Sequence, residues 1–174
     1  MPSGKVHNII NMSVYAALGA GAVWAERSGQ LSIGTAAAAT FTAAFLAGTF
    51  LLSPDLDMAD HRQKVNSKRN WGPLGALWVP YGLVFSHRGL SHTWILGPLT
   101  RLAYLALLVG LGLGLVMTLR PELQLHDLPG PLRTADVWPP AAGYFLSQWL
   151  HLIADGIRPD HALRRARRQR RRTS

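Results

Sequence analysis

The sequence predicts an all-α integral membrane protein, built as a bundle of about four transmembrane helices with a short proline-containing segment and a basic C-terminal tail. Hydrophobic residues make up 48% of the 174 positions and are gathered in long runs instead of recurring at helical spacing, which indicates burial in lipid. Several runs approach 20 residues, the length that a helix needs to cross a hydrocarbon layer of about 30 Å. The mean hydropathy is only +0.11, because polar loops and the tail dilute these runs.

The four predicted spans differ in how many polar residues interrupt them. The first is short and contains Asn11, and the second is free of charge. The third contains one charge, Arg101, and the fourth contains Gln148 and His151. The spans cover residues 9–25, 33–52, 94–119 and 137–154.

A fifth apolar stretch, residues 71–85, contains Pro73 and Pro80. Proline inside a helix removes a hydrogen bond, and a helix over this stretch would reach only about 22 Å. We therefore expect an interfacial or re-entrant segment that does not cross the membrane. The run "GLGLG" at 110–114 lies inside the third span, where Gly110 and Gly114 predict close packing against another helix.

The positive charges predict the orientation of the chain. The formal net charge is +9, and residues 158–174 carry eight of the 18 lysines and arginines. With four spans, 14 of these 18 cations fall on one side, so the positive-inside rule places both termini in the cytoplasm. We expect residues 1–157 to form a single membrane-embedded domain. Residues 158–174 are expected to form a flexible, Arg-rich cytoplasmic tail that contacts anionic lipid headgroups, with no specific nucleic-acid partner.

Ionisable residues gather at the predicted cytoplasmic ends of all four spans. A bundle would bring these ends together, and ionisable groups at membrane depth usually face inward and pair with one another or bind a ligand. The candidate metal ligands are His7, Asp55, Asp57, His87, His92, His151 and Asp155.

Each of these clusters also has a simpler structural explanation. His151 and Asp155, in "HLIAD", are one helical turn apart and could share a cation or make an ordinary interhelical hydrogen bond. "SPDLD" could equally be a solvated turn. His87 and His92 converge only if Gly89 bends the chain. A metal site is the interpretation that explains why all the clusters share one side.

The donor types limit which metal could bind. The chain has no cysteine, so any metal must be held by nitrogen and oxygen atoms. Zinc is the first choice for histidine and aspartate ligands, with manganese or iron as alternatives. Four histidines and three aspartates exceed the needs of one tetrahedral ion. This excess predicts either two ions or one ion with a general base.

Longer motifs carry a resemblance to a known family. The chain resembles a bacterial family of uncharacterised metal-binding membrane proteins, through "MPSGKVH", "SPDLD", the segment around "HRGLSH" and the late "HLIAD". That family is in turn similar to the inner-membrane-associated metal-dependent hydrolases. The resemblance runs over most of residues 2–105 and resumes at 151–155. It implies a multi-pass protein of the bacterial inner membrane that binds a divalent metal through the seven candidate ligands.

The chemistry of such a site stays open at this stage. A metal-dependent hydrolase acting on a phosphoester or a lipid-like molecule would use Arg88 to stabilise an oxyanion, with Asp57 or Asp155 accepting a proton. A non-catalytic protein that binds or senses a metal would need the same ligands. A transporter is less well supported, because the second and third spans lack a polar path. The sequence predicts no oligomeric state.

Overall fold

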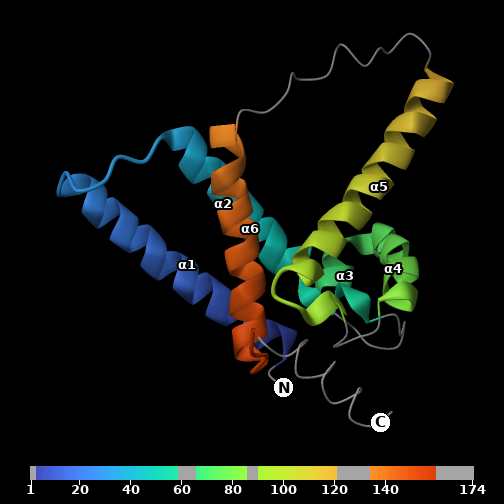
Figure 1. Cartoon of the computed structure of the whole chain (residues 1–174), viewed down its shortest axis with the longest axis horizontal. Coiled ribbons are helices and arrows are strands. Elements are labelled where there is room, and N and C mark those ends of the chain that lie inside the picture. The colour runs from blue at the N-terminus through green and yellow to red at the C-terminus, as the bar shows by residue number, and fades with distance from the viewer. Residues whose placement is uncertain (1–2, 59–65, 86–89, 121–133, 160–174) are drawn as a thin grey trace, which may run out of the picture.

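The structure, a computed structural model, describes residues 3–58, 66–85, 90–120 and 134–159, which contain helices and no strands. The prediction of an all-α protein is therefore confirmed for this part of the chain. Figure 1 shows α1, α2 and α6 on one side and α5 slanting away from them, with the short helices gathered near the lower end of α5. The long helices are α1 (Gly4–Arg27), α2 (Thr35–Phe50), α5 (Leu96–Leu119) and α6 (Thr134–Ala154).

These long helices coincide with the four predicted spans, but the four-span bundle stays a prediction. Within the described residues, α5 is the only helix that is both long and apolar enough to cross a membrane. α2 is apolar but shorter, because the chain turns after Phe50 toward the segment Ser53–Pro54. The lower hydropathy of α1 and α6 follows from polar residues such as Asn11 and Gln148, which are buried between helices.

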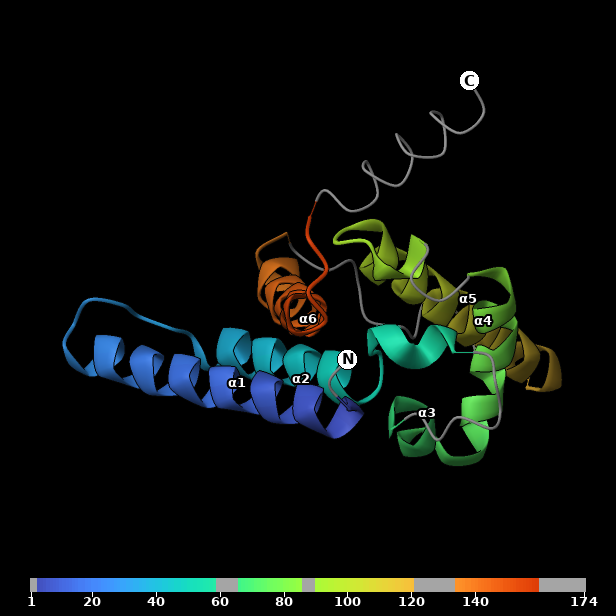
Figure 2. The ribbon, with the colours of Figure 1, turned by 90° about the horizontal axis from the view of Figure 1, so that it is seen from below.

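Close backbone contact joins α2 to α6. A Cβ atom on Gly143 of α6 would lie 2.3 Å from the Phe41 carbonyl oxygen of α2, so only glycine permits this approach. α1 lies beside the pair in Figure 2. The Asn11 side-chain amide ties all three helices, donating to Thr49 Oγ1 at 3.0 Å and to the Ser147 carbonyl at 3.1 Å.

The expected packing of the third span through its glycines is wrong. A Cβ atom on Gly110 or Gly114 would meet nothing within 4 Å. The physical reason is that α5 diverges from α2 and α6 along its length, so this part of α5 has no neighbouring helix among the described residues (Figure 1). Between the long helices, the described glycines that permit close packing are Gly48 and Gly143, which the sequence interpretation did not single out.

The proline-containing segment breaks into two short helices instead of one span. These are η2 (Gly72–Trp78) and α4 (Val79–Val84), and each has its proline in the first turn, where the missing amide hydrogen costs nothing. They follow α3 (Asn66–Asn70) and pack together with it against η1 (Pro54–Asp57). Residues 71–85 thus form two short helices that pack against the preceding segments, and whether they cross a membrane stays a prediction.

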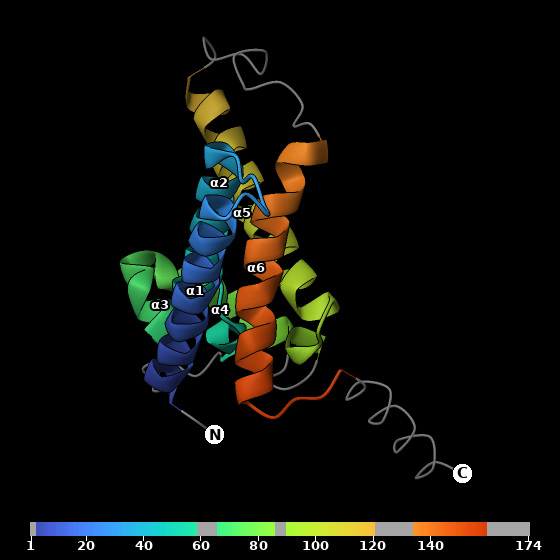
Figure 3. The ribbon, with the colours of Figure 1, turned by 90° about the vertical axis from the view of Figure 1, so that its left-hand side faces the viewer.

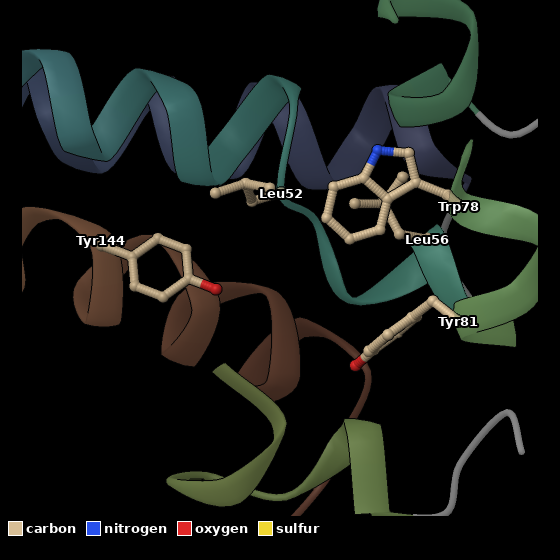
Figure 4. Packing of buried hydrophobic residues seen from close by; sticks show 5 residues of the cluster. All are labelled: Leu52, Leu56, Trp78, Tyr81 and Tyr144. Carbon is tan, nitrogen blue, oxygen red and sulfur yellow. The ribbon is translucent and has the colours of Figure 1, made fainter. Parts of the chain in front are cut away.

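An aromatic core holds this folded segment in place. Trp78 and Leu56 are fully buried, and Tyr81 is 1% exposed. Figure 4 shows these side chains converging with Leu52 and Tyr144, which come from the region of α2 and from α6. The core therefore fixes η1, and with it the two aspartates that η1 carries, against the long helices.

The candidate ligands that the structure describes lie at one end of the molecule. Figure 3 shows the start of α1, the end of α6 and the short helices at the same end. The short helix η3 (Leu90–His92) leads into α5 there. A Cβ on Gly97 would lie 2.1 Å from the Ser91 carbonyl oxygen, so the start of α5 is pressed against η3.

Candidate metal centre

Four segments, distant in sequence, supply the polar side chains at this end. His7 lies on the first turns of α1, and His151 and Asp155 lie at the end of α6. η1 carries Asp55 and Asp57, and η3 carries Ser91 and His92. Among the described residues, the candidate ligands lie in two groups, one formed by α1, η1 and α6 and the other by η1 and η3.

We call the first group the pocket and define it as His7, Asp55, His151 and Asp155. His7 Nε2 lies 3.2 Å from Asp155 Oδ1, and His151 Nε2 lies 3.5 Å from Asp155 Oδ2. His151 Nε2 also lies 3.6 Å from Asp55 Oδ1. The two imidazole rings stack with centroids 3.9 Å apart, so both rings present an Nε2 atom to the same carboxylate.

The spacing of these atoms suits one metal ion. One ligand atom each from His7, His151 and Asp155 can be chosen so that all three lie within 4.8 Å of one another. In a tetrahedral zinc site with bonds of 2.0 to 2.2 Å, neighbouring ligand atoms are about 3.4 Å apart. The nitrogen-to-oxygen distances in the pocket scatter around this value, which is longer than an ordinary hydrogen bond.

Several polar atoms of the pocket also lack hydrogen bonds. Both carboxylate oxygens of Asp155, His151 Nε2 and His7 Nδ1 are buried without a hydrogen-bond partner of good geometry. A buried polar atom left in this state is costly and calls for an explanation, of which a bound ion is one. The donor set, the distances and these atoms together fit a divalent cation.

The carboxylates of the pocket are ionised in the structure. Burial raises the pKa of Asp155, but close contact with the imidazoles of His151 and His7 outweighs burial and leaves the pKa well below its usual range. Burial also raises the pKa of Asp55, but the adjacent His151 and the more distant His92 and His7 outweigh burial. The pKa of Asp55 is therefore lowered as well. Ionised carboxylates are the form that binds a cation.

We call the second group the Asp57–His92 pair. His92 Nδ1 lies 3.1 Å from Asp57 Oδ2, and both side chains are fully buried. The Ser91 hydroxyl donates to the same Asp57 oxygen and lies 3.1 Å from His92 Nδ1. When a carboxylate accepts from Nδ1–H, the lone pair of the imidazole is on Nε2, the atom that can bind a metal or accept a proton.

The helix η1 connects the two groups. Asp55 belongs to the pocket and Asp57 to the pair, and the 3-10 helix begins at Ser53 and Pro54. The Ser53 hydroxyl accepts from the Asp55 amide at 3.4 Å, which starts the turn. Asp55 is close enough to His92 for that imidazole to lower its pKa, so the two groups share one electrostatic environment.

Two residues on the polar stripe of α6 have structural roles. Gln148 Nε2 donates to the Gly48 carbonyl at 3.0 Å, and the Tyr144 hydroxyl donates to the Pro98 carbonyl at 3.1 Å. These bonds tie α6 to α2 and to the start of α5. They orient the last turn of α6, where His151 and Asp155 lie.

Two predicted site residues lie outside the described residues, and two residues near the site were not among the predicted ones. His87 and Arg88 lie outside the described part of the chain, so their predicted roles stay predictions. Ser91 was not singled out, although it contacts both members of the pair. Arg101 was treated only as a charge within a span, whereas the structure buries it fully beside Ser91. Its signal was its position one turn inside an otherwise uncharged run.

Comparison with known proteins supports the metal-binding interpretation. Residues 2–165 match the family described as "Uncharacterized metal-binding protein (DUF2227)". An uncharacterized protein of Aquifex aeolicus (strain VF5) is 43% identical over 65 residues, which are 37% of this chain and 43% of that protein. The matched segment thus spans less than half of this relative's length. No solved structure matches the chain.

Proposed function

We propose that this chain, which belongs to that family of uncharacterized metal-binding proteins, holds a divalent metal ion in the pocket and uses it to hydrolyse an ester at the membrane surface. The observation that carries the proposal is the convergence of His7, His151 and Asp155 within 4.8 Å, from both ends of the described chain. Zinc suits two imidazoles and a carboxylate, with manganese or iron as alternatives. A second ion at the Asp57–His92 pair would account for the surplus of donors and is the alternative to a pair that acts as a general base.

We also propose that the chain is embedded in the bacterial inner membrane by several helices, with the pocket and both termini on the cytoplasmic side. The support is an inverted distribution of side chains, with polar residues inside and apolar residues outside. His7, Asn11 and Gln148 are buried, whereas Leu111, Leu115 and Leu119 of α5 are between 62% and 69% exposed. The most apolar part of α5 has none of its residues buried, and soluble proteins rarely expose such a surface. In this arrangement the Arg-rich tail, residues 158–174, contacts anionic headgroups.

Hydrolysis is consistent with different roles for the pocket, which would bind the ion, and the Asp57–His92 pair, which would accept a proton. A divalent ion supplies Lewis acidity and lowers the pKa of a bound water, which provides a nucleophile near neutral pH. His7, His151 and Asp155 hold the ion. His92, oriented by Asp57 and Ser91, accepts a proton through Nε2, so the proton-accepting role moves from Asp57 itself to this pair. The predicted part of Arg88 in stabilising an oxyanion remains a proposal.

One observation favours a non-catalytic role in binding or sensing a metal. Asp55 Oδ1 lies 3.6 Å from His151 Nε2, so a small movement of η1 would add a fourth protein ligand. A coordination sphere filled by protein atoms is typical of structural sites, whereas catalytic sites keep one position open. The two functions therefore differ in whether Asp55 binds the ion.

The test is elemental analysis of detergent-purified protein followed by assays of ester hydrolysis. We expect about one or two equivalents of a transition metal per chain. We also expect metal-dependent release of product from a chromogenic phosphodiester or a phospholipid, which a chelator abolishes and added metal restores. Protein that retains stoichiometric metal but hydrolyses no phosphodiester or lipid ester would rule out the hydrolase and leave the non-catalytic function.

A further inference from the structure

Arg101 is a fully buried cation in the second turn of α5. Among the described residues, its Nη1 donates a hydrogen bond to the Ser91 carbonyl oxygen at 3.1 Å. Its Nε and Nη2 atoms are buried without a hydrogen-bond partner. Within the described ranges, no carboxylate lies at ion-pair distance from it.

A buried arginine with unsatisfied donors destabilises the folded protein. Removing a guanidinium from water costs several kcal/mol, and proteins normally recover this with a carboxylate and further hydrogen bonds. A structural contact to Ser91 alone would not need a charged group, since a neutral donor could bond the same carbonyl. The guanidinium therefore calls for an anionic partner.

The surroundings of Arg101 suit an oxyanion. The Tyr144 hydroxyl lies against its guanidinium. Tyr81 is close enough for the guanidinium to act on its pKa, which burial nevertheless raises above the usual range. The Tyr81 hydroxyl lies 2.9 Å from Thr100 Oγ1. The guanidinium has a planar fork of donors that matches the geometry of phosphate.

An apolar cavity of about 310 Å³ shares Tyr144 with this group. Tyr144 forms part of its wall, and Leu52, Leu102 and Phe145 line it as well. The ring of Tyr144 faces the cavity while its hydroxyl reaches toward Arg101. A molecule with an alkyl chain and a phosphate group could therefore occupy both places at once.

We propose that Arg101 is the anion-binding residue of this protein and that it receives the phosphate group of an amphiphilic ligand whose alkyl chain lies in the adjoining cavity. The ligand's phosphate then lies beside Ser91 and the Asp57–His92 pair, because Arg101 bonds the carbonyl of Ser91. The inference deepens the proposed function by naming its substrate class, and it depends on that function for the reaction but not for the binding.

The experiment measures ligand binding to full-length protein in neutral detergent by calorimetry and by thermal stabilisation. Inorganic phosphate, dihexanoyl phosphatidic acid and uncharged dihexanoylglycerol are the three probes. We expect both phosphate-bearing probes to bind, the lipid more tightly than free phosphate, and dihexanoylglycerol to bind weakly. Equal affinity for the lipid and free phosphate would overturn the part of the proposal that concerns the cavity.

The decisive variants are Arg101→Met and Arg101→Lys, with Arg27→Gln as the matched control. Arg27 is exposed at the far end of α1, so its loss removes the same charge without touching the site. We expect Arg101→Met to bind the phosphate probes about tenfold to a hundredfold more weakly, as for loss of charged hydrogen bonds. Arg101→Lys should retain part of the affinity, and Arg27→Gln all of it.

Two further measurements separate this inference from metal binding and from a purely structural role. The difference between wild type and Arg101→Met should persist after the metal is removed with a chelator, and Arg101→Met should retain its metal content. Phosphate affinity within twofold of wild type in Arg101→Met, or no binding of any phosphate probe by wild type, would overturn the proposal. If Arg101→Met does not fold, a full-affinity Arg101→Lys would count equally against the proposed fork.

Discussion

The pocket and the Asp57–His92 pair use the same residue types but satisfy their polar atoms in different ways. In the pocket, two imidazoles face the carboxylate of Asp155 at 3.2 and 3.5 Å without hydrogen-bond geometry. In the pair, the Ser91 hydroxyl bonds Asp57 directly and lies beside His92. The contrast indicates that a cation would suit the carboxylate and imidazoles of the pocket, whereas the Asp57 carboxylate already accepts a hydrogen bond from the protein.

The largest effect that separates the two groups is expected from Asp155→Ala. Among the residues that the structure describes, this change removes the one carboxylate that meets both imidazoles of the pocket. We expect metal affinity to fall by at least about a hundredfold, more than is typical for residues behind the ligands. Elemental analysis after dialysis checks this, with the exposed Glu26→Ala as a control of equal charge change. An Asp155→Ala protein that keeps its full metal content would remove the basis for the pocket.

Asp57→Asn should have a smaller effect, because we predict that Asp57 acts through His92. Loss of a carboxylate that orients a histidine usually lowers metal affinity or activity by about 10- to 100-fold. We expect full metal content at saturating metal with reduced hydrolysis. A complete loss of metal, equal to that of Asp155→Ala, would instead make Asp57 a direct ligand and erase the distinction between the groups.

Acidification tests the pocket through its histidines. The pKa values of Asp55 and Asp155 are lowered in the folded protein, so both carboxylates stay ionised from pH 7.5 to pH 5.5. Imidazoles in general titrate near pH 6.5 and must lose a proton to bind a metal. Metal affinity should therefore fall by about tenfold or more over this range, as measured with a competing chelator. Affinity that does not change with pH would exclude histidine ligands.

The smallest effect is expected from a change in the scaffold that carries only one of the groups. A methyl group on Gly143 would meet the Phe41 carbonyl, so Gly143→Ala should push α6 from α2 and destabilise the fold by about 1 to 3 kcal/mol. The displaced α6 should weaken metal binding by a few-fold. Gly112→Ala on α5 meets nothing and should be neutral or slightly stabilising in thermal unfolding. Equal stability of the two variants would contradict the tight α2–α6 contact.

The sequence was sufficient for the helices and for the convergence of candidate ligands, because both follow from local patterns. Runs of apolar residues located all four long helices, and the polar residues at their ends identified His7, Asp55, His151 and Asp155. The partners of individual residues could not be predicted in this way. Whether Gly110 or Gly143 packs against a neighbour depends on which helices diverge, and that is a property of the whole arrangement.

The same limit explains why the role of Arg101 was not visible beforehand. A single arginine in an apolar run could face lipid, snorkel to the interface or be buried. Only the contact with Ser91 and the unsatisfied Nε and Nη2 atoms distinguish these cases. Similarly, the division of Asp55 and Asp57 between two groups depends on the 3-10 turn of η1, which the motif "SPDLD" alone does not specify.

The pocket joins His7, near the start of the first described helix, to Asp155, just after the last one. During synthesis at about 5 to 20 residues per second, roughly 7 to 30 s separate the appearance of these two side chains. The nascent chain must therefore keep α1 available while every intervening segment is synthesised, and the pocket of the proposed function is complete only when α6 has left the ribosome. Metal binding would then be a late step that occurs only in a full-length chain. A chain truncated before α6 would lack the complete pocket and bind no metal there.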